Sequence, residues 1–337
     1  MAISTSGILA LQPGRSCPLH YRYSPADFAH SANFTAETLY VIGGIYGNVP
    51  ALEAVLALAA DEPAPVTLMF NGDFNWFNID DAGFRTVNTA VLRHHALRGN
   101  VETEIAADNS DAGCGCAYPA YVSADEVARS NDIMVQLRTT AQRHAEIRTG
   151  LAALPMHAVA DVGGVRVAIV HGDLQSLAGW SLSHDTLALA HVQNNVQKQL
   201  VTAQCRIVAS SHTCLPVAHL LDTDNRYVGR CAIFNNGAAG MPNFRGESFG
   251  VITRIATRPA PQGSLYGTRI GDVHLDALAV HYDHVRWQRE FLANWPAGSA
   301  AYLSYVCRMT QGPAYSINVA NRLTVSNPGT ARPTAIA

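Results

Sequence analysis

Residues 39–48, LYVIGGIYGN, decide the fold class of this chain. The apolar run at 39–42 predicts a buried strand that stops at a pair of glycines. Apolar residues then recur over 52–59 with the i, i+3, i+4, i+7 spacing of an amphipathic helix, and Asn48 suits its N-cap. A strand, a tight glycine turn and a helix in this order indicate an α/β fold.

The same alternation of apolar runs and helical periodicity continues along the chain. Further strands are predicted at 66–70, 95–98, 157–162, 165–170, 206–209, 227–234, 250–256 and 273–282. Helices are predicted at 80–93, 123–154, 186–201, 284–293 and 299–311. We expect an irregular arm over 1–37, a core domain over 38–258, and a C-terminal extension over 259–337 that packs on the core and ends in a disordered tail.

Four of the predicted strands end in a polar side chain next to glycine or serine. These side chains are Asp73, Asn100, His171 and His212. Because side chains at the carboxyl ends of strands converge on one crevice in α/β sheets, we expect all four to lie near one point. One carboxylate, one amide oxygen and two imidazoles suit a divalent transition metal such as Zn, Mn or Fe.

Six short motifs resemble those of a known family. In chain order they are Gly-Gly-Ile-Tyr-Gly-Asn (43–48), Gly-Asp (72–73), Gly-Asn-Val-Glu (99–102), His-Gly-Asp (171–173), Ser-His-Thr-Cys (211–214) and Asn-Gly-Ala-Ala-Gly-x-Pro (236–242). The series resembles the calcineurin-like metallophosphoesterases over residues 38–258. The resemblance implies a four-layer αββα sandwich of two mixed β-sheets flanked by helices. It also implies a two-metal site that hydrolyses phosphate esters with a metal-bound hydroxide.

The chain departs from the family pattern on one side of the implied site. Where the family has Asp-x-His, residues 44–46 read Gly-Ile-Tyr, and where it has Gly-His-x-His, residues 211–214 read Ser-His-Thr-Cys. The family's Asn-His-Glu/Asp is Asn-Val-Glu at 100–102, which removes an imidazole thought to act on the leaving group or phosphate. The second-metal positions are all filled, by Asp73, Asn100, His171 and His212.

Tyr46 and Cys214 stand at altered first-metal positions, and the sequence leaves two interpretations open. Phenolate and thiolate are anionic metal ligands, so with Asp73 they would rebuild a first site that suits Fe(III) or Zn. Alternatively, Tyr46 packs in the core and Cys214 is a small buried thiol. We keep both as candidate metal ligands, so that one metal ion is expected and a second is left open.

Other side chains have weaker signals. Cys114-Gly115-Cys116, with Cys17, would allow a structural zinc or a redox pair, but the C-x-C spacing favours an unliganded loop. Trp76 and Trp180 follow candidate metal motifs and are candidates to line a substrate pocket. The helix expected from about residue 299 carries Tyr305, and we expect it to pack near the crevice.

The motifs together predict a metal-dependent phosphoric ester hydrolase, a phosphatase or phosphodiesterase, with Asp73, Asn100, His171 and His212 as catalytic residues. Without an imidazole at 101, good substrates are restricted to acidic leaving groups, such as nucleotides or aryl esters. The alternative is a catalytically impaired member of the fold that serves as a binding or scaffold protein. The filled quartet counts against it. A third alternative is different chemistry at a Tyr- and Cys-ligated metal.

Composition and charge restrict the partners. The 337 residues carry 23 Lys+Arg and 26 Asp+Glu, a net charge of −3, which is unlike the basic footprint of a nucleic-acid binder. No apolar run approaches the ~20 residues of a membrane span, and the first residues lack a basic segment typical of a signal peptide. We expect a cytoplasmic protein with reduced thiols, a small phosphorylated substrate, and no nucleic-acid or membrane partner. Assembly into a homo-oligomer is left open.

Overall fold

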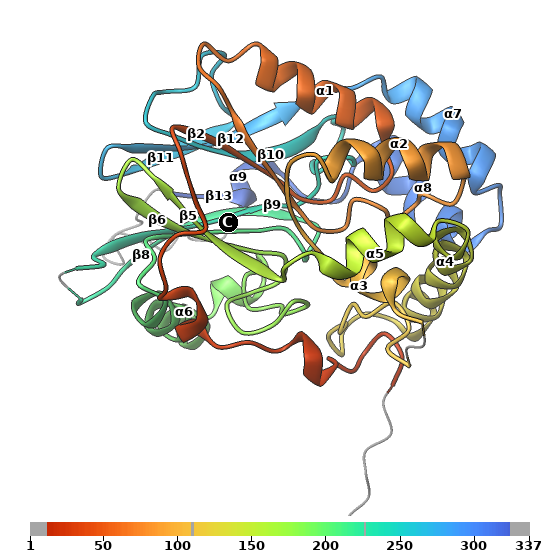
Figure 1. Cartoon of the computed structure of the whole chain (residues 1–337), viewed down its shortest axis with the longest axis horizontal. Helices are drawn as coiled ribbons and strands as arrows, with labels where there is room; N and C mark the ends of the chain where they lie inside the picture. The colour runs from red at the N-terminus through yellow and green to blue at the C-terminus, as the bar shows by residue number, and fades with distance from the viewer. Residues whose placement is uncertain (1–11, 109–110, 226, 324–337) are drawn as a thin grey trace, which may run out of the picture.

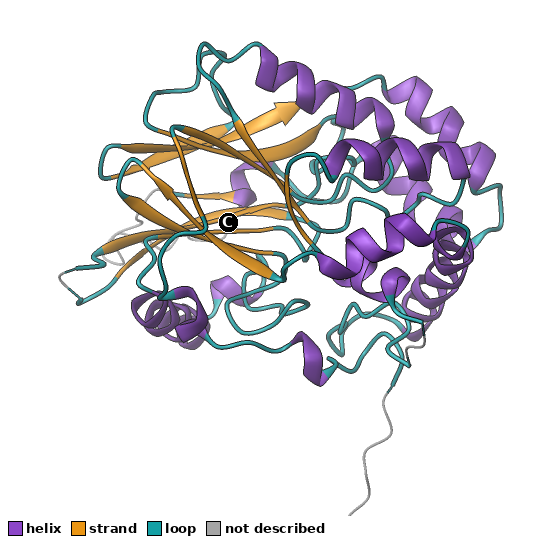
Figure 2. Cartoon of the chain, viewed as in Figure 1, coloured by secondary structure: helices purple, strands orange, loops and turns teal. Residues whose placement is uncertain are grey.

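Two β-sheets face each other between layers of helices. The structure is a computed structural model, and it describes residues 12–108, 111–225 and 227–323. In Figure 1 the two sheets lie one above the other, with α1 (Val49–Ala60) over the upper sheet and α6 (Ala190–Ala203) under the lower one. Figure 2 shows the same layers by secondary structure. The four-layer αββα sandwich predicted from the motifs is therefore confirmed.

The lower sheet is mixed and has seven strands in the described part of the chain. In spatial order they are β1 (Phe34–Ala36), β5 (His157–Val162), β6 (Val165–Val170), β7 (Ile207–Ser210), β9 (Arg230–Asn236), β8 (Pro216–Asp222) and β13 (Asn321–Arg322). β6, β7 and β9 run parallel, whereas β5 is antiparallel to β6 and β8 is antiparallel to β9. The outer strands β1 and β13 run parallel to β5 and β8. Gly163 and Gly164 form the β5–β6 hairpin turn with φ of 56° and 79°, as a two-residue primed turn requires.

The upper sheet is also mixed and has six strands among the described residues. In spatial order they are β11 (Tyr266–Ile270), β12 (Val273–Val280), β10 (Gly250–Ala256), β2 (Thr38–Ile42), β3 (Thr67–Asn71) and β4 (His95–Leu97). β2, β3 and β4 are parallel, and β10 is antiparallel to β2. Because β11 and β12 complete this sheet, it continues past the boundary expected at residue 258.

Strand β2 shows why the stretch at 39–48 fixes the architecture. All five of its residues are buried. Leu39 and Val41 join the core between the sheets, whereas Tyr40 and Ile42 join the core under the helices. This alternation follows from the two-residue period of a strand, so an unbroken apolar run marks a strand covered on both faces.

Helices cover both outer faces. Besides α1 and α6 they are α2 (Asp81–Val91), α3 (Asn100–Ala106), α4 (Ala124–Gln142), α5 (Ala145–Ala153), α7 (His284–Asn294) and α8 (Ala300–Gln311). The short α9 (Ile317–Ala320) instead packs Ile317 and Ala320 into the core between the sheets. The single helix predicted over 123–154 is wrong, because the chain breaks at His144 (φ −126°, ψ 64°) between α4 and α5. The buried His144 ring stacks on Phe84 at 5.1 Å and its Nε2 lies 2.6 Å from Asp81 Oδ1, contacts that hold it outside the helix.

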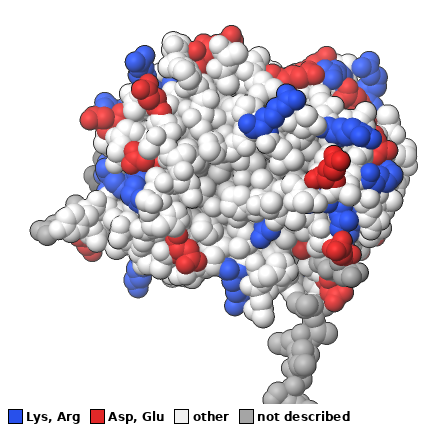
Figure 3. Space-filling view, in the orientation of Figure 1, with Lys and Arg blue, Asp and Glu red and all other residues white. Residues whose placement is uncertain are grey.

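The two ends of the chain pack on this core where they are described. The arm contributes β1 and two short 3-10 helices, and Tyr21 donates a 2.6 Å hydrogen bond to the buried Glu104. The C-terminal residues 324–337, where a disordered tail is expected, lie outside the described residues, as do 1–11. No helix of the described residues is both long and apolar enough to cross a bilayer. On the face in Figure 3, acidic and basic side chains are interspersed.

Candidate metal centre

The four predicted side chains meet between the two sheets. Asp73 and Asn100 follow the parallel strands β3 and β4 of the upper sheet, and His171 and His212 follow β6 and β7 of the lower sheet. All four are buried, with 7% exposure or less. The carboxyl ends of parallel strands therefore converge on one point, as the sequence predicts.

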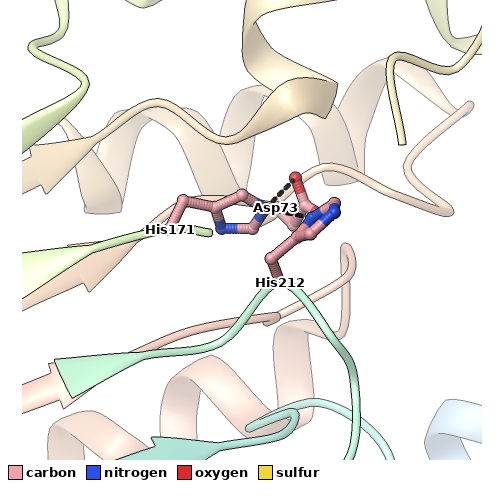
Figure 4. A group of neighbouring side chains, drawn as sticks. All are labelled: Asp73, His171 and His212. Carbon is pink, nitrogen blue, oxygen red and sulfur yellow. Dashed lines mark hydrogen bonds and ion pairs between the residues drawn. The ribbon is translucent and has the colours of Figure 1, made fainter. Parts of the chain in front are cut away.

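His171 lies at the middle of the group. Its Nε2 is 3.3 Å from Asp73 Oδ1, 3.2 Å from Asn100 Oδ1 and 3.2 Å from His212 Nδ1. One ligand atom each of Asp73, His171 and His212 lie within 4.8 Å of one another. Figure 4 shows these three side chains pointing toward a common centre.

Backbone carbonyls fix which atoms face inward. His171 Nδ1 lies 2.9 Å from Asn71 O, and His212 Nε2 lies 3.0 Å from Cys116 O. Asn100 Nδ2 donates to Cys114 O at 2.9 Å. A carbonyl oxygen only accepts, so each of these outward nitrogens carries a proton. The inward atoms, His171 Nε2, His212 Nδ1 and Asn100 Oδ1, are therefore the acceptors of their groups.

The donor set fits a metal cation. Three neutral acceptors and the Asp73 carboxylate point their lone pairs at one another, which is repulsive unless a positive charge lies among them. A single proton can satisfy only one or two of them. Nitrogen and oxygen donors in this mixture suit Zn, Mn or Fe, and hydrogen-bonded imidazoles are the usual state of histidine ligands.

The charges of the group are mutually stabilised. Burial works against protonation of His171, but the Asp73 carboxylate raises the pKa of His171 above its usual 6.5. Burial likewise works to raise the pKa of Asp73, and the His171 imidazolium holds it below its usual range. Burial and the nearby His171 lower the pKa of His212 to about 3. Without a cation, these shifts favour an ion pair between protonated His171 and ionised Asp73, with His212 neutral.

Glu102 fixes the loops that carry two of these side chains. Its carboxylate accepts from the backbone N–H of Asp73 at 2.7 Å, of Gly99 at 3.0 Å and of Asn75 at 3.2 Å. Burial and the charge of Asp73 raise the pKa of Glu102 to about 7. Glu102 therefore positions Asp73 and Asn100 from behind.

Backbone strain gathers at this centre. Five non-glycine residues of the described chain have positive φ, and three of them are Tyr46 (56°), Asp73 (52°) and Cys214 (62°). The left-handed conformation costs L-residues roughly 1–2 kcal/mol, and such strained residues cluster at functional sites. The turns after β2, β3 and β7 are thus bent to aim side chains at the centre.

Tyr46 and Cys214 contact each other. The Tyr46 hydroxyl lies 3.1 Å from Cys214 Sγ. Burial raises the pKa of Tyr46 well above its usual value, and burial also raises the pKa of Cys214. In the described residues, Cys214 Sγ is not part of the group of His, Cys and carboxylate ligand atoms around His171. As placed, the two side chains form a neutral hydrogen-bonded pair.

The Tyr46 ring also occupies space that a side chain at position 44 would need. A Cβ built on Gly44 would lie 2.9 Å from Tyr46 Cζ and 3.3 Å from Ala238 Cα, and Gly44 has a φ of 66°. The two departures from the family's Asp-x-His pattern are therefore sterically linked.

The centre opens onto a cavity of about 30 Å3. It is lined by Tyr46, Asp73, Trp76, Asn100, Cys116, Tyr118, Trp180, His212, Cys214 and Tyr305. Trp180 donates to Cys116 O at 3.0 Å, and Trp76 stands edge-on to Tyr305 at 6.5 Å. The cavity at the centre is thus lined by Trp76 and Trp180, which the sequence suggested for a pocket, and by Tyr305 of the helix expected near the crevice. The cavity exceeds the roughly 10–15 Å3 that one water needs.

Sequence reasoning missed the role of the Cys114-Gly115-Cys116 loop. Its carbonyls position Asn100 and His212, and Cys116 Sγ also accepts from Asn100 Nδ2 at 3.6 Å. No residue-type signal encodes the direction of a carbonyl. All seven cysteines are free thiols, and Cys17 Sγ lies 3.2 Å from Ser176 Oγ. The described residues hold no zinc-like cluster at these cysteines. Tyr118 was missed as well, because it lies in an irregular loop without periodicity.

Comparison with known proteins identifies the fold. No protein-family model and no curated protein matches the chain significantly. Its structure resembles a metallophosphoesterase from Sphaerobacter thermophilus with a TM-score of 0.52 and 16% identity, over 82% of this chain and 100% of that one. It also resembles hypothetical protein PH1004 from Pyrococcus horikoshii OT3 with a TM-score of 0.53 and 15% identity, over 82% of this chain and 99% of that one. The chain therefore has the metallophosphoesterase fold, as its motifs predict.

Proposed function

We propose that this chain is a metal-dependent phosphoric ester hydrolase of the metallophosphoesterase family. The observation that carries the proposal is the convergence of four inward-facing acceptors, three of them held by backbone carbonyls behind them. A scaffold has no physical need for such a set, because uncompensated buried acceptors destabilise a fold. The fold agrees with this function.

Each residue of the quartet has a role in this proposal. His171, His212, Asp73 and Asn100 hold a divalent ion, and Asp73 supplies the only full negative charge among them. A divalent ion held there supplies Lewis acidity toward a phosphoryl oxygen and lowers the pKa of water. The carbonyls of Cys114 and Cys116 keep Asn100 and His212 aimed at the ion.

The substrate class follows from the group beside Asn100. Val101 is fully buried and apolar, so it donates no proton to a leaving group. Small phosphate esters with acidic leaving groups, such as aryl esters, need no such donor. We therefore propose these as substrates, either as monoesters or as diesters.

Metal analysis combined with an activity screen tests the proposal. We expect about one Zn, Mn or Fe per purified chain, and hydrolysis of 4-nitrophenyl phosphate or bis(4-nitrophenyl) phosphate that stops on chelation. Adding back one equivalent of metal should restore the activity. A chain that binds no metal and hydrolyses neither ester would be the scaffold instead.

Metal affinity is expected to rise with pH. The pKa of His171 is raised above 6.5, whereas the pKa of His212 is about 3 and that of Asp73 is below its usual range. Only His171 therefore has to lose a proton on metal binding near neutral pH. Below the pKa of His171 the apparent affinity should fall about tenfold per pH unit, with one proton released per metal bound.

Calorimetric titration with Mn²⁺ in two buffers of different ionisation enthalpy measures this proton release. The stability of the metal-free protein depends on pH in the opposite direction. The His171–Asp73 ion pair stabilises the fold while His171 is protonated and Asp73 is ionised, and this contribution is lost as the pH rises through the raised pKa of His171. An affinity that stays constant between about pH 5 and 7 would contradict the assignment of His171 as a ligand.

A further inference from the structure

The small cavity at the metal centre is chemically divided. Asp73, Asn100 and His212 contribute the acceptors described above to its lining, whereas Tyr46 and Cys214 contribute a phenol and a thiol. An anion bound to a cation among the acceptors would share this cavity with the phenol and the thiol. We propose that the Tyr46 hydroxyl donates a hydrogen bond to an oxygen of the phosphoryl group bound at the centre. This inference rests on the proposed function.

The direction of the Tyr46–Cys214 hydrogen bond supports the proposal. Cys214 Sγ donates to His212 O at 3.3 Å, so the thiol proton is already used. The sulfur is then the acceptor in the 3.1 Å contact, and the phenol is the donor. Because thiol sulfur is a weak acceptor, a phosphoryl oxygen, which is charged, competes well for the phenol proton.

The Tyr46 ring is held in place on several sides. Its backbone N–H donates to Asp73 O at 3.2 Å, so the phenol and the carboxylate belong to adjoining turns. The ring packs edge-on against Phe77 at 5.8 Å. Gly44 leaves room for the ring because it has no side chain. The hydroxyl is therefore preorganised, which limits the entropy lost when it binds an anion.

A positively charged side chain, Arg308, lies behind the turn that carries Cys214. The Arg308 guanidinium donates to Cys214 O at 2.7 Å and to Pro242 O at 3.0 Å. It works to lower the pKa of Cys214, although burial keeps that pKa raised. Arg308 thus positions the Cys214 turn and adds a potential that favours an anion next to Tyr46.

Tyr46→Phe tests the proposal with inorganic phosphate as the probe. The variant keeps the ring and removes only the hydroxyl. We expect metal content to stay unchanged and the dissociation constant of the metal-loaded protein for phosphate, measured by calorimetry, to rise about tenfold or more, the size expected for a hydrogen bond to a charged group. The kcat/KM for 4-nitrophenyl phosphate should fall by a similar factor.

Two further variants separate this role from a structural one. Tyr121→Phe changes an exposed tyrosine in the same way and should leave phosphate binding unchanged. Cys214→Ala removes the present acceptor of the phenol and should tighten phosphate binding. A purely structural Tyr46–Cys214 pair predicts equal losses in Tyr46→Phe and Cys214→Ala instead.

The outcomes are distinguishable. Wild-type affinity in Tyr46→Phe overturns this inference alone. Loss of metal in that variant also overturns it, since Tyr46 would then be a ligand. A metal-loaded wild-type chain that neither binds phosphate nor hydrolyses an ester overturns the proposed function, and this inference with it.

Discussion

The Asp73→Asn protein is expected to lose most of its metal and at least about 100-fold in kcat/KM for aryl phosphate hydrolysis, since even outer-shell changes at metal sites cost 10–100-fold. Asp73 is the only negatively charged member of the quartet. Asparagine has nearly the same volume, and it tolerates the left-handed backbone that Asp73 adopts at a φ of 52°. Its amide oxygen can still accept from Val101 N–H, a bond of 3.2 Å in the structure. The loss would therefore report charge rather than folding.

Asp272→Asn is the matched control, because Asp272 is fully exposed and forms only a surface ion pair with Arg269. It should keep wild-type metal content and activity. Metal content by elemental analysis, kcat/KM and the thermal unfolding midpoint are measured for both variants. If Asp73→Asn kept full metal occupancy and activity, the quartet would not be the metal site.

The quartet could be predicted because each member has a local signal. Each member follows a short apolar run that predicts a strand: Asp73, Asn100, His171 and His212. Parallel strands bring their carboxyl ends to the same edge of a sheet, whatever segments connect them. The parts of the centre that depend on backbone direction could not be predicted. The carbonyls of the Cys114–Cys116 loop and the three N–H groups at Glu102 point inward because of loop geometry, which residue types do not encode.

The strands of the fold could likewise be predicted where they carry a local apolar signal. Strand β10 was placed at its observed bounds, Gly250–Ala256, by its apolar run. Strands β8 and β11 were missed. β8 begins at a proline and carries His219 at a half-buried position, and β11 alternates exposed and partly buried residues within a short span. In both, pairing with a neighbour makes the strand, and a single sequence does not show the neighbour.

The linked departures at Gly44 and Tyr46 predict what restoring the first-metal side requires. Gly44→Asp alone should destabilise the protein by about 2–4 kcal/mol, because its Cβ would lie 2.9 Å from Tyr46 Cζ in a left-handed conformation. Gly246→Asp is the matched control, since Gly246 has a φ of 76° with open space around its Cβ position. The difference between the two free energies of unfolding, measured with denaturant on metal-free protein, gives the cost of the steric clash at position 44, with the Tyr46 ring and the Ala238 backbone.

Adding Tyr46→His to Gly44→Asp should recover part of this stability, because imidazole is smaller than phenol and histidine tolerates positive φ. The recovery is a coupling energy that two independent sites would not show. Adding Cys214→His as well replaces a neutral hydrogen-bonded pair by two imidazoles and a carboxylate, the kind of ligands that borderline divalent ions prefer. We expect the triple variant to bind two metals per chain instead of one.

If the wild-type chain already bound two, and the Tyr46→Phe and Cys214→Ala variants still did, the second ion would not lie next to Tyr46. If the triple variant bound only one, the Tyr46 ring would not be what excludes the second ion, and the turn after β2 would have to differ from the family in more than its side chains.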